Sequence, residues 1–320
     1  MSTPHNIVLF IDGSWNKPSR AQPTNVYKLF RSSVADAGGS RPQLTYYLPG
    51  VGHDIRQHRI GAAVGGHGGP WSAALPLRPE LPRGLGAARG LLGGVFGAGT
   101  AARIKEAYAF LCHHFIRASG DRIYVFGFSR GAFAARSLAG FVFRVGTLLA
   151  DKLHLVEAAY AVYESGHNPD DTVLACFLQQ AADVAMLQQA DDPAAMPLHF
   201  VGLWDTVAAL GLPRRAAIFT ADRTEHHQRT PPLNVLTARH ALALHELRAD
   251  FRPELWHGHG HTNLQQLWFA GAHGDVGGGY ALAESGLSNL PLQWMADEAR
   301  ASGLRLEEPL LAGYLSAGEE

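Results

Sequence analysis

One serine stands in a sequence pattern that could make it a nucleophile. Residues 127–131 read Gly-Phe-Ser-Arg-Gly, which fits the pattern Gly-x-Ser-x-Gly with Ser129 at its centre. Because so short a pattern recurs by chance, an ordinary glycine-rich turn is the alternative interpretation. Here four apolar residues, 123–126, precede the pattern, and a run of small residues follows it. This context predicts a strand, a sharp turn and a helix, with Ser129 Oγ projecting from the turn.

A serine hydroxyl is a weak nucleophile until a histidine accepts its proton, and a carboxylate must orient that histidine. In this kind of site the three residues follow one another in the order Ser, Asp, His. Asp205 comes just after a predicted strand at 199–203, and His273 just after another at 267–271. We therefore predict Ser129, Asp205 and His273 as catalytic residues. A turn or N-cap role for the aspartate and a structural loop role for the histidine are the alternatives.

Other histidines compete with this prediction, because the chain has seventeen of them. His240 is the main rival base, but residues 235–248 have a helical pattern in which a histidine commonly packs or is exposed. His257, His259 and His261 alternate with glycine and could bind a transition metal, although no nearby cysteine or carboxylate completes a recognisable site. We predict a flexible loop at these three histidines, with no metal and no other cofactor.

Three residues near the predicted triad could assist it. The N–H of Arg130 begins the helix after the serine, where the helix dipole favours the negative charge of an oxyanion. Asp275, two residues after the predicted base, is a candidate for substrate binding, although we favour a role in shaping the loop. Arg136 lies further along the helix, where an ion pair is its expected role.

Distant parts of the chain must come together to form such a site. Strands are predicted from apolar runs at residues 6–11, 44–48, 123–126, 199–203 and 267–271, and helices from patterns at 26–35, 100–117, 132–149, 152–187, 235–248 and 291–302. Strands that alternate with helices predict an α/β fold with a mostly parallel sheet and helices on both faces. Ligands of such sheets gather at the carboxyl ends of the strands, where the predicted triad lies.

One segment interrupts this alternation. Residues 61–99 are crowded with glycine, proline and alanine, have no sustained period and carry little charge. We predict a long Gly/Pro-rich insertion that serves as a lid or surface loop. The 320 residues as a whole are predicted to form a single α/β-hydrolase-like catalytic domain with this insertion.

Composition narrows the classes of protein. Hydrophobic residues make up 47% and charged residues 17%, which is typical of a globular chain. A net charge of -1 argues against nucleic acid as a partner. Cys112 and Cys176 lie in apolar surroundings and are predicted to be reduced core residues. With no Sec signal peptide and no transmembrane stretch, we predict a cytoplasmic protein or export without a Sec signal, and only peripheral membrane contact.

Five segments, in this order, resemble the DUF2235 family: DGSWN (12–16), YYLPGVG (46–52), GFSRGAFAARSLAG (127–140), VGLWDTVAALG (201–211) and WFAGAHGDVGGGY (268–280). The resemblance implies an α/β-hydrolase fold. Because the family includes the Tle1-type phospholipase effectors of bacterial type VI secretion, it also implies a serine esterase or lipase. The family's triad corresponds to Ser129, Asp205 and His273.

The resemblance also concerns the first of these segments. It implies that Gly13 and Ser14 follow the strand before the family's oxyanion loop, so that the N–H of one of them is the second oxyanion donor; an ordinary turn is the alternative. Asp12, in the same turn, is a candidate for substrate binding. The chain departs from the family at Gly274, where serine is frequent, and at His245, where ALDE-like sequence is frequent.

The leading hypothesis is hydrolysis of carboxylic esters, of lipids or phospholipids, through an acyl-enzyme on Ser129. A non-catalytic binding or assembly module on a hydrolase scaffold is the alternative. Metal-assisted phosphoester hydrolysis that uses Asp12 and the histidine run is a third hypothesis. The expected partner is an ester or lipid substrate, and the oligomeric state is left open.

Overall fold

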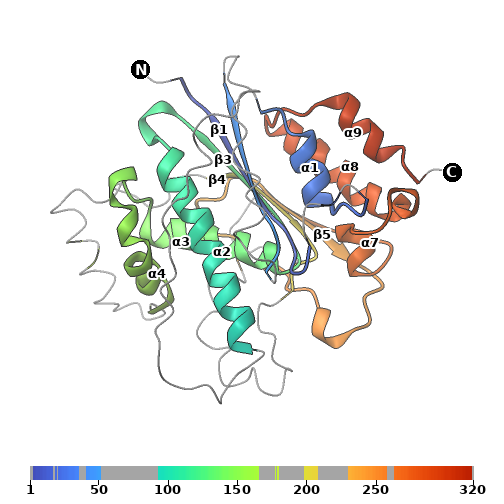
Figure 1. Ribbon diagram of the computed structural model, residues 1–320, viewed down its shortest axis with the longest axis horizontal. Coiled ribbons are helices and arrows are strands. Elements are labelled where there is room, and N and C mark those ends of the chain that lie inside the picture. The colour runs from blue at the N-terminus through green and yellow to red at the C-terminus, as the bar shows by residue number, and fades with distance from the viewer. Residues whose placement is uncertain are drawn as a thin grey trace.

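Six strands pair side by side in the order β2-β1-β3-β4-β5-β6, and every neighbouring pair is parallel, in the computed structural model of the protein (Figure 1). They are β1 (Asn6–Ile11), β2 (Gln43–Leu48), β3 (Arg122–Phe128), β4 (Leu198–Trp204), β5 (Ala238–Ala243) and β6 (Leu264–Phe269). The structure describes residues 3–16, 19, 21–35, 41–51, 93–165, 177, 179, 198–207, 230–257 and 263–318. Since β2 and β3 lie on opposite sides of β1, the order reverses there, and open parallel sheets bind ligands at the carboxyl side of such a reversal.

Helices cover both faces of the sheet. In the described residues they are α1 (Asn25–Ser32), α2 (Gly93–His114), α3 (Arg130–Val145), α4 (Val156–Ser165), α7 (His273–Gly277), α8 (Gly286–Ala301) and α9 (Glu308–Leu315), with 3-10 segments η2 (Arg117–Ser119), η3 (Ala150–Leu155), η6 (Ala249–Phe251) and η7 (Leu282–Glu284). Figure 1 shows α2, α3 and α4 on one face and α1, α8 and α9 on the other. The predicted α/β fold is therefore confirmed.

The apolar run of β1 illustrates why the strands form in the interior. Ile7 and Leu9 belong to the hydrophobic core on the side of α2 and α3, whereas Val8 and Phe10 belong to the core on the side of α1 and α8. All four side chains are completely buried. A strand buried on both faces reads as a continuous apolar run, which is how the sequence indicated it.

One predicted element is wrong. Residues 235–248 were expected to form a helix, but the structure forms the strand β5 there, with all six residues buried. The segment Ala-Arg-His-Ala-Leu-Ala has a composition that favours a helix. Parallel pairing with β4 on one side and β6 on the other overrides that local preference, because the backbone of a central strand is hydrogen-bonded along both edges.

Other predictions are met in part or lie outside the described residues. The helix expected at 152–187 begins as η3 and α4, which end at Ser165; most of the remainder is outside the described part. Of the predicted lid at 61–99, residues 61–92 are also outside it, and the last residues begin α2. The helix α9 was not predicted. Among the helices that the structure describes, none has the length and hydropathy needed to cross a bilayer.

The first turn of α3 lies directly against the end of β1. A Cβ atom at Gly131 would stand 2.1 Å from Ile11 O and 2.6 Å from Asp12 O. Both obstacles are backbone atoms, one at the last residue of a central strand and one at the residue after it, and they cannot move without disturbing the sheet. Gly140 lies later in the same helix and has room, because the nearest atom to its Cβ would be the Tyr163 hydroxyl at 3.4 Å.

We predict that Gly131→Ala destabilises the fold by about 2 kcal/mol or more, because the added methyl group overpacks the contact between helix and strand. Gly140→Ala is the matched control and should leave stability unchanged or raise it by up to about 1 kcal/mol, since alanine favours a helix interior. Urea unfolding of both variants measures the difference. Equal midpoints for the two variants would contradict the close approach.

Candidate active site

Ser129 occupies a strained turn between β3 and α3. Its φ of 58° and ψ of -124° lie in a region that costs a non-glycine residue about 1–3 kcal/mol. The turn is held because Ser129 N–H donates to Trp204 O at 3.0 Å and Phe133 N–H donates to Ser129 O at 3.2 Å. A Cβ at Gly127 would stand 2.5 Å from Gly131 O, so side chains are excluded around the turn. The serine side chain makes no capping bond to α3, which leaves its hydroxyl for other partners.

Asp205 lies immediately beyond β4, the strand beside β3. It is completely buried and has a positive φ of 39°. Its N–H donates to Ala241 O at 2.8 Å, and its Oδ1 accepts the N–H of Ala243 at 3.0 Å. The end of β5 therefore fixes both the main chain and one carboxylate oxygen of Asp205. The other oxygen, Oδ2, faces His273.

His273 begins the short helix α7, and its Nδ1 lies 2.6 Å from Asp205 Oδ2. An ionised carboxylate can only accept, so Nδ1 carries the proton of this bond, and in the neutral imidazole Nε2 has the lone pair. The imidazole lies 4.7 Å from the ring of Phe128, the residue before Ser129, measured between ring centroids. The structure thus joins Asp205 to His273 and places His273 beside the turn. In the described part of the chain Ser129 Oγ makes no hydrogen bond, so its contact with His273 stays a prediction.

The ion pair between Glu246 and Arg248, which the sequence did not indicate, supports the backbone of His273. Glu246 Oε2 accepts the N–H of His273 at 3.2 Å. Arg248 binds the same carboxylate, since its Nε and Nη2 donate to it at 2.8 and 2.7 Å. These hydrogen bonds lower the pKa of Glu246 to about 2. The Arg248 guanidinium in turn lies over the ring of Phe251. The helix predicted for residues 235–248 did not indicate this role of Glu246, because in a helix its side chain would not point toward His273.

His240, the rival base, has a different place. It lies on β5, is completely buried, and accepts the N–H of Thr206 on Nε2 at 3.2 Å. Burial, assisted by the charge of Arg136, lowers its pKa to about 3. His240 is therefore a neutral interior histidine whose Nε2 is already engaged in a hydrogen bond within the protein. Arg136, expected in an ion pair, packs instead on the ring of Trp256 at 4.9 Å.

Asp275 shapes the loop that carries His273. Its Oδ2 accepts the N–H of Ala272 at 2.8 Å. Gly271 has a φ of 103°, and a Cβ there would stand 2.3 Å from the Cβ of Asp275. His245 reaches the same loop, since its Nδ1 accepts the N–H of Gly271 at 3.0 Å. These contacts agree with the loop-shaping role that we favour for Asp275, and a substrate contact from it stays a prediction.

Asp12 organises the turn after β1. Its Oδ2 accepts hydrogen bonds from Thr24 Oγ1 at 2.6 Å and Tyr47 Oη at 2.5 Å, and its Oδ1 accepts the N–H of Gly13 at 2.7 Å. Thr24 also caps α1 by accepting the N–H of Tyr27. Because the Gly13 N–H is already bonded, Ser14 remains as the candidate second oxyanion donor on this turn.

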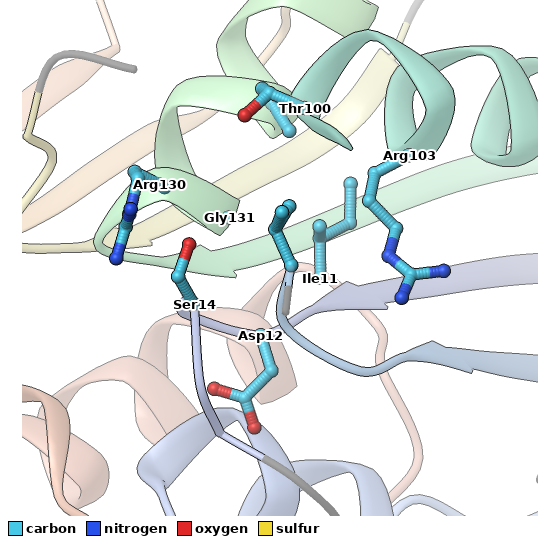
Figure 2. Close-up of a pocket in the computed structure, with 9 residues that line it drawn as sticks. Ile11, Asp12, Ser14, Thr100, Arg103, Arg130 and Gly131 are labelled. Carbon is cyan, nitrogen blue, oxygen red and sulfur yellow. The ribbon is translucent and has the colours of Figure 1, made fainter. Parts of the chain in front are cut away.

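A shallow hollow lies beside this turn (Figure 2). It is lined by Ile11, Asp12, Ser14, Val51, Thr100, Arg103, Arg130, Gly131 and Ala134. Figure 2 shows the Asp12 carboxylate pointing away from it. The hydroxyl of Ser14 is buried and has no hydrogen-bond partner among the described residues. Both candidate oxyanion residues, Ser14 and Arg130, therefore border the same space.

Two remaining predictions concern cysteine and metal. Cys112 is buried, and burial raises the pKa of its thiol to about 12, as suits an unreactive core residue; Cys176 is outside the described residues. Of the histidine run, only His257 is described. Across the described ranges, no three side chains of His, Cys, Asp or Glu are grouped as metal ligands.

We predict that the contribution of Asp12 to stability depends on pH. Burial raises its pKa from 3.8 to about 6, so the folded state binds the proton more tightly than the unfolded state. The resulting stabilisation is complete below pH ~4 and is lost as the pH rises through ~6, and a pKa difference of about 2 corresponds to about 3 kcal/mol at most. We measure the free energy of unfolding in urea for the wild type and for Asp12→Asn. The wild-type value minus the variant value should therefore fall as the pH rises from 4 to 7.

Asp151→Asn is the control for this experiment, because the side chain of Asp151 is 69% exposed. The difference in free energy of unfolding between the wild type and Asp151→Asn should not show the same dependence on pH. If the difference in free energy of unfolding between the wild type and Asp12→Asn does not change with pH, burial does not raise the pKa of Asp12 and the prediction is wrong.

The chain is similar to several known proteins. A family model described as "T6SS, Phospholipase effector Tle1-like, catalytic domain" matches residues 5–298. The chain is 30% identical over 257 residues to uncharacterized protein YEL023C of Saccharomyces cerevisiae, an alignment that covers 78% of this chain and 32% of that relative.

Two solved structures are also similar. One is an uncharacterized protein from Pseudomonas aeruginosa, with a TM-score of 0.53, 19% identity, and coverage of 99% of this chain and 49% of that one. The other is the Tle1 effector bound to the VgrG spike from the type 6 secretion system, with a TM-score of 0.45, 18% identity, and coverage of 89% and 53%. The chain spans about half of these two proteins. The family model covers most of the chain, and the protein therefore belongs to the family of Tle1-like phospholipase effector catalytic domains.

Proposed function

We propose that the protein is a serine hydrolase that cleaves carboxylic ester bonds of lipids, with phospholipids as the favoured substrate class. The observation that carries the proposal is the buried pair of Asp205 and His273, joined at 2.6 Å beside the strained turn of Ser129. Membership of a phospholipase effector family supports the lipid substrate.

In the proposed reaction, Ser129 Oγ attacks the acyl carbonyl carbon while His273 Nε2 accepts the hydroxyl proton. The tetrahedral intermediate then breaks its carbon–oxygen bond to the alcohol, and the imidazolium returns the proton to the leaving oxygen. Water attacks the resulting acyl-enzyme by the same route, with His273 as base, and releases the carboxylic acid. Each turnover consumes one ester and one water and restores both side chains.

The electrostatics support these roles. When His273 becomes an imidazolium, its positive charge lies 2.6 Å from a carboxylate that is completely buried, where charges interact more strongly than in water. The oxyanion would be held by the N–H of Arg130, at the start of α3, and the N–H of Ser14. The N–H of Gly13 is committed to Asp12, which is why we assign the second donor to Ser14.

We predict that Ser129→Ala lowers kcat/KM for any hydrolysed ester by at least about 10³-fold, since the nucleophile is removed while binding is retained. Ser137→Ala is the control, because it makes the same change on the same helix two turns away from the strand ends. A panel of p-nitrophenyl esters of increasing chain length, together with phospholipids, measures the loss and identifies the preferred acyl chain and head group.

The outcomes of this panel separate the hypotheses. Turnover that survives Ser129→Ala would contradict the proposal, and turnover that disappears with a chelator would favour metal-assisted phosphoester chemistry. A wild type that hydrolyses none of the esters would favour the non-catalytic binding module.

Peripheral contact with a lipid surface is a further part of the proposal. Two apolar side chains are strongly exposed on loops at the carboxyl edge of the sheet: Trp15, at 61%, and Leu247, at 95%. Trp15 follows Ser14, and Leu247 lies between the two residues of the ion pair that supports His273. A lipid substrate presented as an aggregate would meet these side chains beside the proposed site.

We predict that hydrolysis of a lipid ester rises when the substrate passes its micellar threshold, and that Leu247→Glu weakens this rise without changing hydrolysis of a short soluble ester. Leu233→Glu is the matched control, because Leu233 is 67% exposed but precedes β5, at the opposite edge of the sheet. An equal response of both variants would contradict contact through this edge. Activity on short soluble esters alone would indicate a soluble esterase.

A further inference from the structure

We infer that His240 is a positioning residue for Asp205, the carboxylate that orients His273: it holds the backbone that follows Asp205 and connects it, through a ring of contacts, to the helix that begins after Ser129. The inference rests on the proposed function, in which Asp205 orients His273. It assigns a role to a buried polar cluster that the proposed reaction itself does not use.

Asp205 needs such support because its backbone conformation is unfavourable. A positive φ of 39° is unfavourable for a non-glycine residue, so the turn relaxes unless its neighbours prevent it. On the side of β4, the N–H of Asp205 is held by Ala241 O. On the other side the chain continues into Thr206, which is completely buried and is held by His240.

The hydrogen bonds of His240 define its tautomer. Thr206 N–H donates to Nε2 at 3.2 Å, and Thr206 Oγ1 lies 3.1 Å from the same nitrogen. Because a backbone N–H can only donate, Nε2 must accept, and the ring proton is therefore on Nδ1. Nδ1 lies 3.2 Å from Gln266 Oε1 and donates to it. His240 thus relays one hydrogen bond from the Asp205 turn on β4 to a side chain on β6.

Gln266 continues the chain of contacts. Its Oε1 also accepts the N–H of Trp256 at 2.8 Å, and its Nε2 donates to Trp256 O at 2.7 Å. The side-chain amide therefore binds both backbone groups of one residue. This arrangement anchors the segment around Trp256 against β6.

Arg136 and Glu254 close the ring. Arg136, from α3, packs its guanidinium on the Trp256 ring at 4.9 Å and donates to Glu254 O and Leu255 O. Glu254 N–H donates to Thr206 O at 2.8 Å. The residue after Asp205 is thereby held at its N–H by His240 and at its carbonyl by the segment that Arg136 binds. Since α3 starts at the residue after Ser129, the turns of Ser129 and Asp205 are connected through the interior as well as through the sheet.

A neutral histidine suits this position. His240 is completely buried and faces Arg136, the charged group that acts on it, and both effects lower its pKa to about 3. If Nε2 were protonated, its N–H would point at the N–H of Thr206 and the contact would be lost. His240 therefore keeps its accepting nitrogen at neutral pH and does not compete with His273 for protons.

The test follows the proton on His273 Nδ1, which gives a far-downfield ¹H NMR signal when it is hydrogen-bonded to Asp205 and requires no substrate. His240→Leu should broaden or shift this signal and lower kcat about 10- to 100-fold, with KM changed by less than ~3-fold, because misplacing Asp205 affects chemistry rather than binding. His199→Leu is the matched control: it breaks the contact of Nε2 with Ser302 O, at 2.9 Å, at the opposite end of β4. It should leave signal and kcat unchanged.

Gln266→Met provides a second variant, should His240→Leu not fold. Gln266 is only partly buried, and its neighbour Gln265 is exposed on the opposite face of β6, so Gln265→Met is its control. The inference predicts that Gln266→Met shifts the signal and lowers kcat in the same direction as His240→Leu, and that Gln265→Met does neither.

The two readouts separate this inference from the proposed function. A wild type that shows the signal but hydrolyses no ester would overturn the proposed function, while the signals of the variants would still test the positioning role. If Gln266→Met and every folded His240 variant keep both the wild-type signal and the wild-type kcat, the positioning role is wrong.

Discussion

Parallel pairing of the strands is the constraint on which the rest of the structure depends. The ladder of backbone hydrogen bonds continues one residue beyond the strands: Asp12 N–H donates to Leu48 O, Ser129 N–H to Trp204 O, and Asp205 N–H to Ala241 O, at 2.8–3.0 Å. Each polar residue is thus tied to the adjacent strand before its own turn begins. Segments remote in sequence meet at one edge because all six strands run in the same direction.

That anchoring allows unfavourable backbone geometry at the site. Ser129 and Asp205 are two of the three non-glycine residues with positive φ in the described chain. Their strain is offset by burial of the sheet on both faces and, around Ser129, by glycines whose missing side chains let α3 approach β1. The core beneath the strand ends therefore supports the strained turns. The polar ring around His240 extends that support to the far side of Asp205.

The sequence predicted those parts of the fold whose signal is local. The doubly buried run of β1 and the strand, turn and helix around Ser129 can be recognised from a few adjacent residues. The strand β5 could not, since its Ala-rich sequence favours a helix and its pairing partners are distant. The order of Asp205 and His273 was predictable, whereas their contact spans 68 residues and exists only in the folded chain. Glu246 and His240 were missed as supports for the same reason.

In the proposed reaction, Ser129, His273 and the two backbone N–H donors act together on one acyl carbonyl group. A crystal structure of the protein after reaction with a fluorophosphonate ester tests it most directly, because the phosphorus adduct resembles the tetrahedral intermediate. We expect phosphorus bonded to Ser129 Oγ, its oxygen accepting hydrogen bonds from the N–H groups of Ser14 and Arg130, and His273 Nε2 within hydrogen-bond distance of Oγ. An adduct on another residue, or an oxygen turned away from both N–H groups, would contradict it.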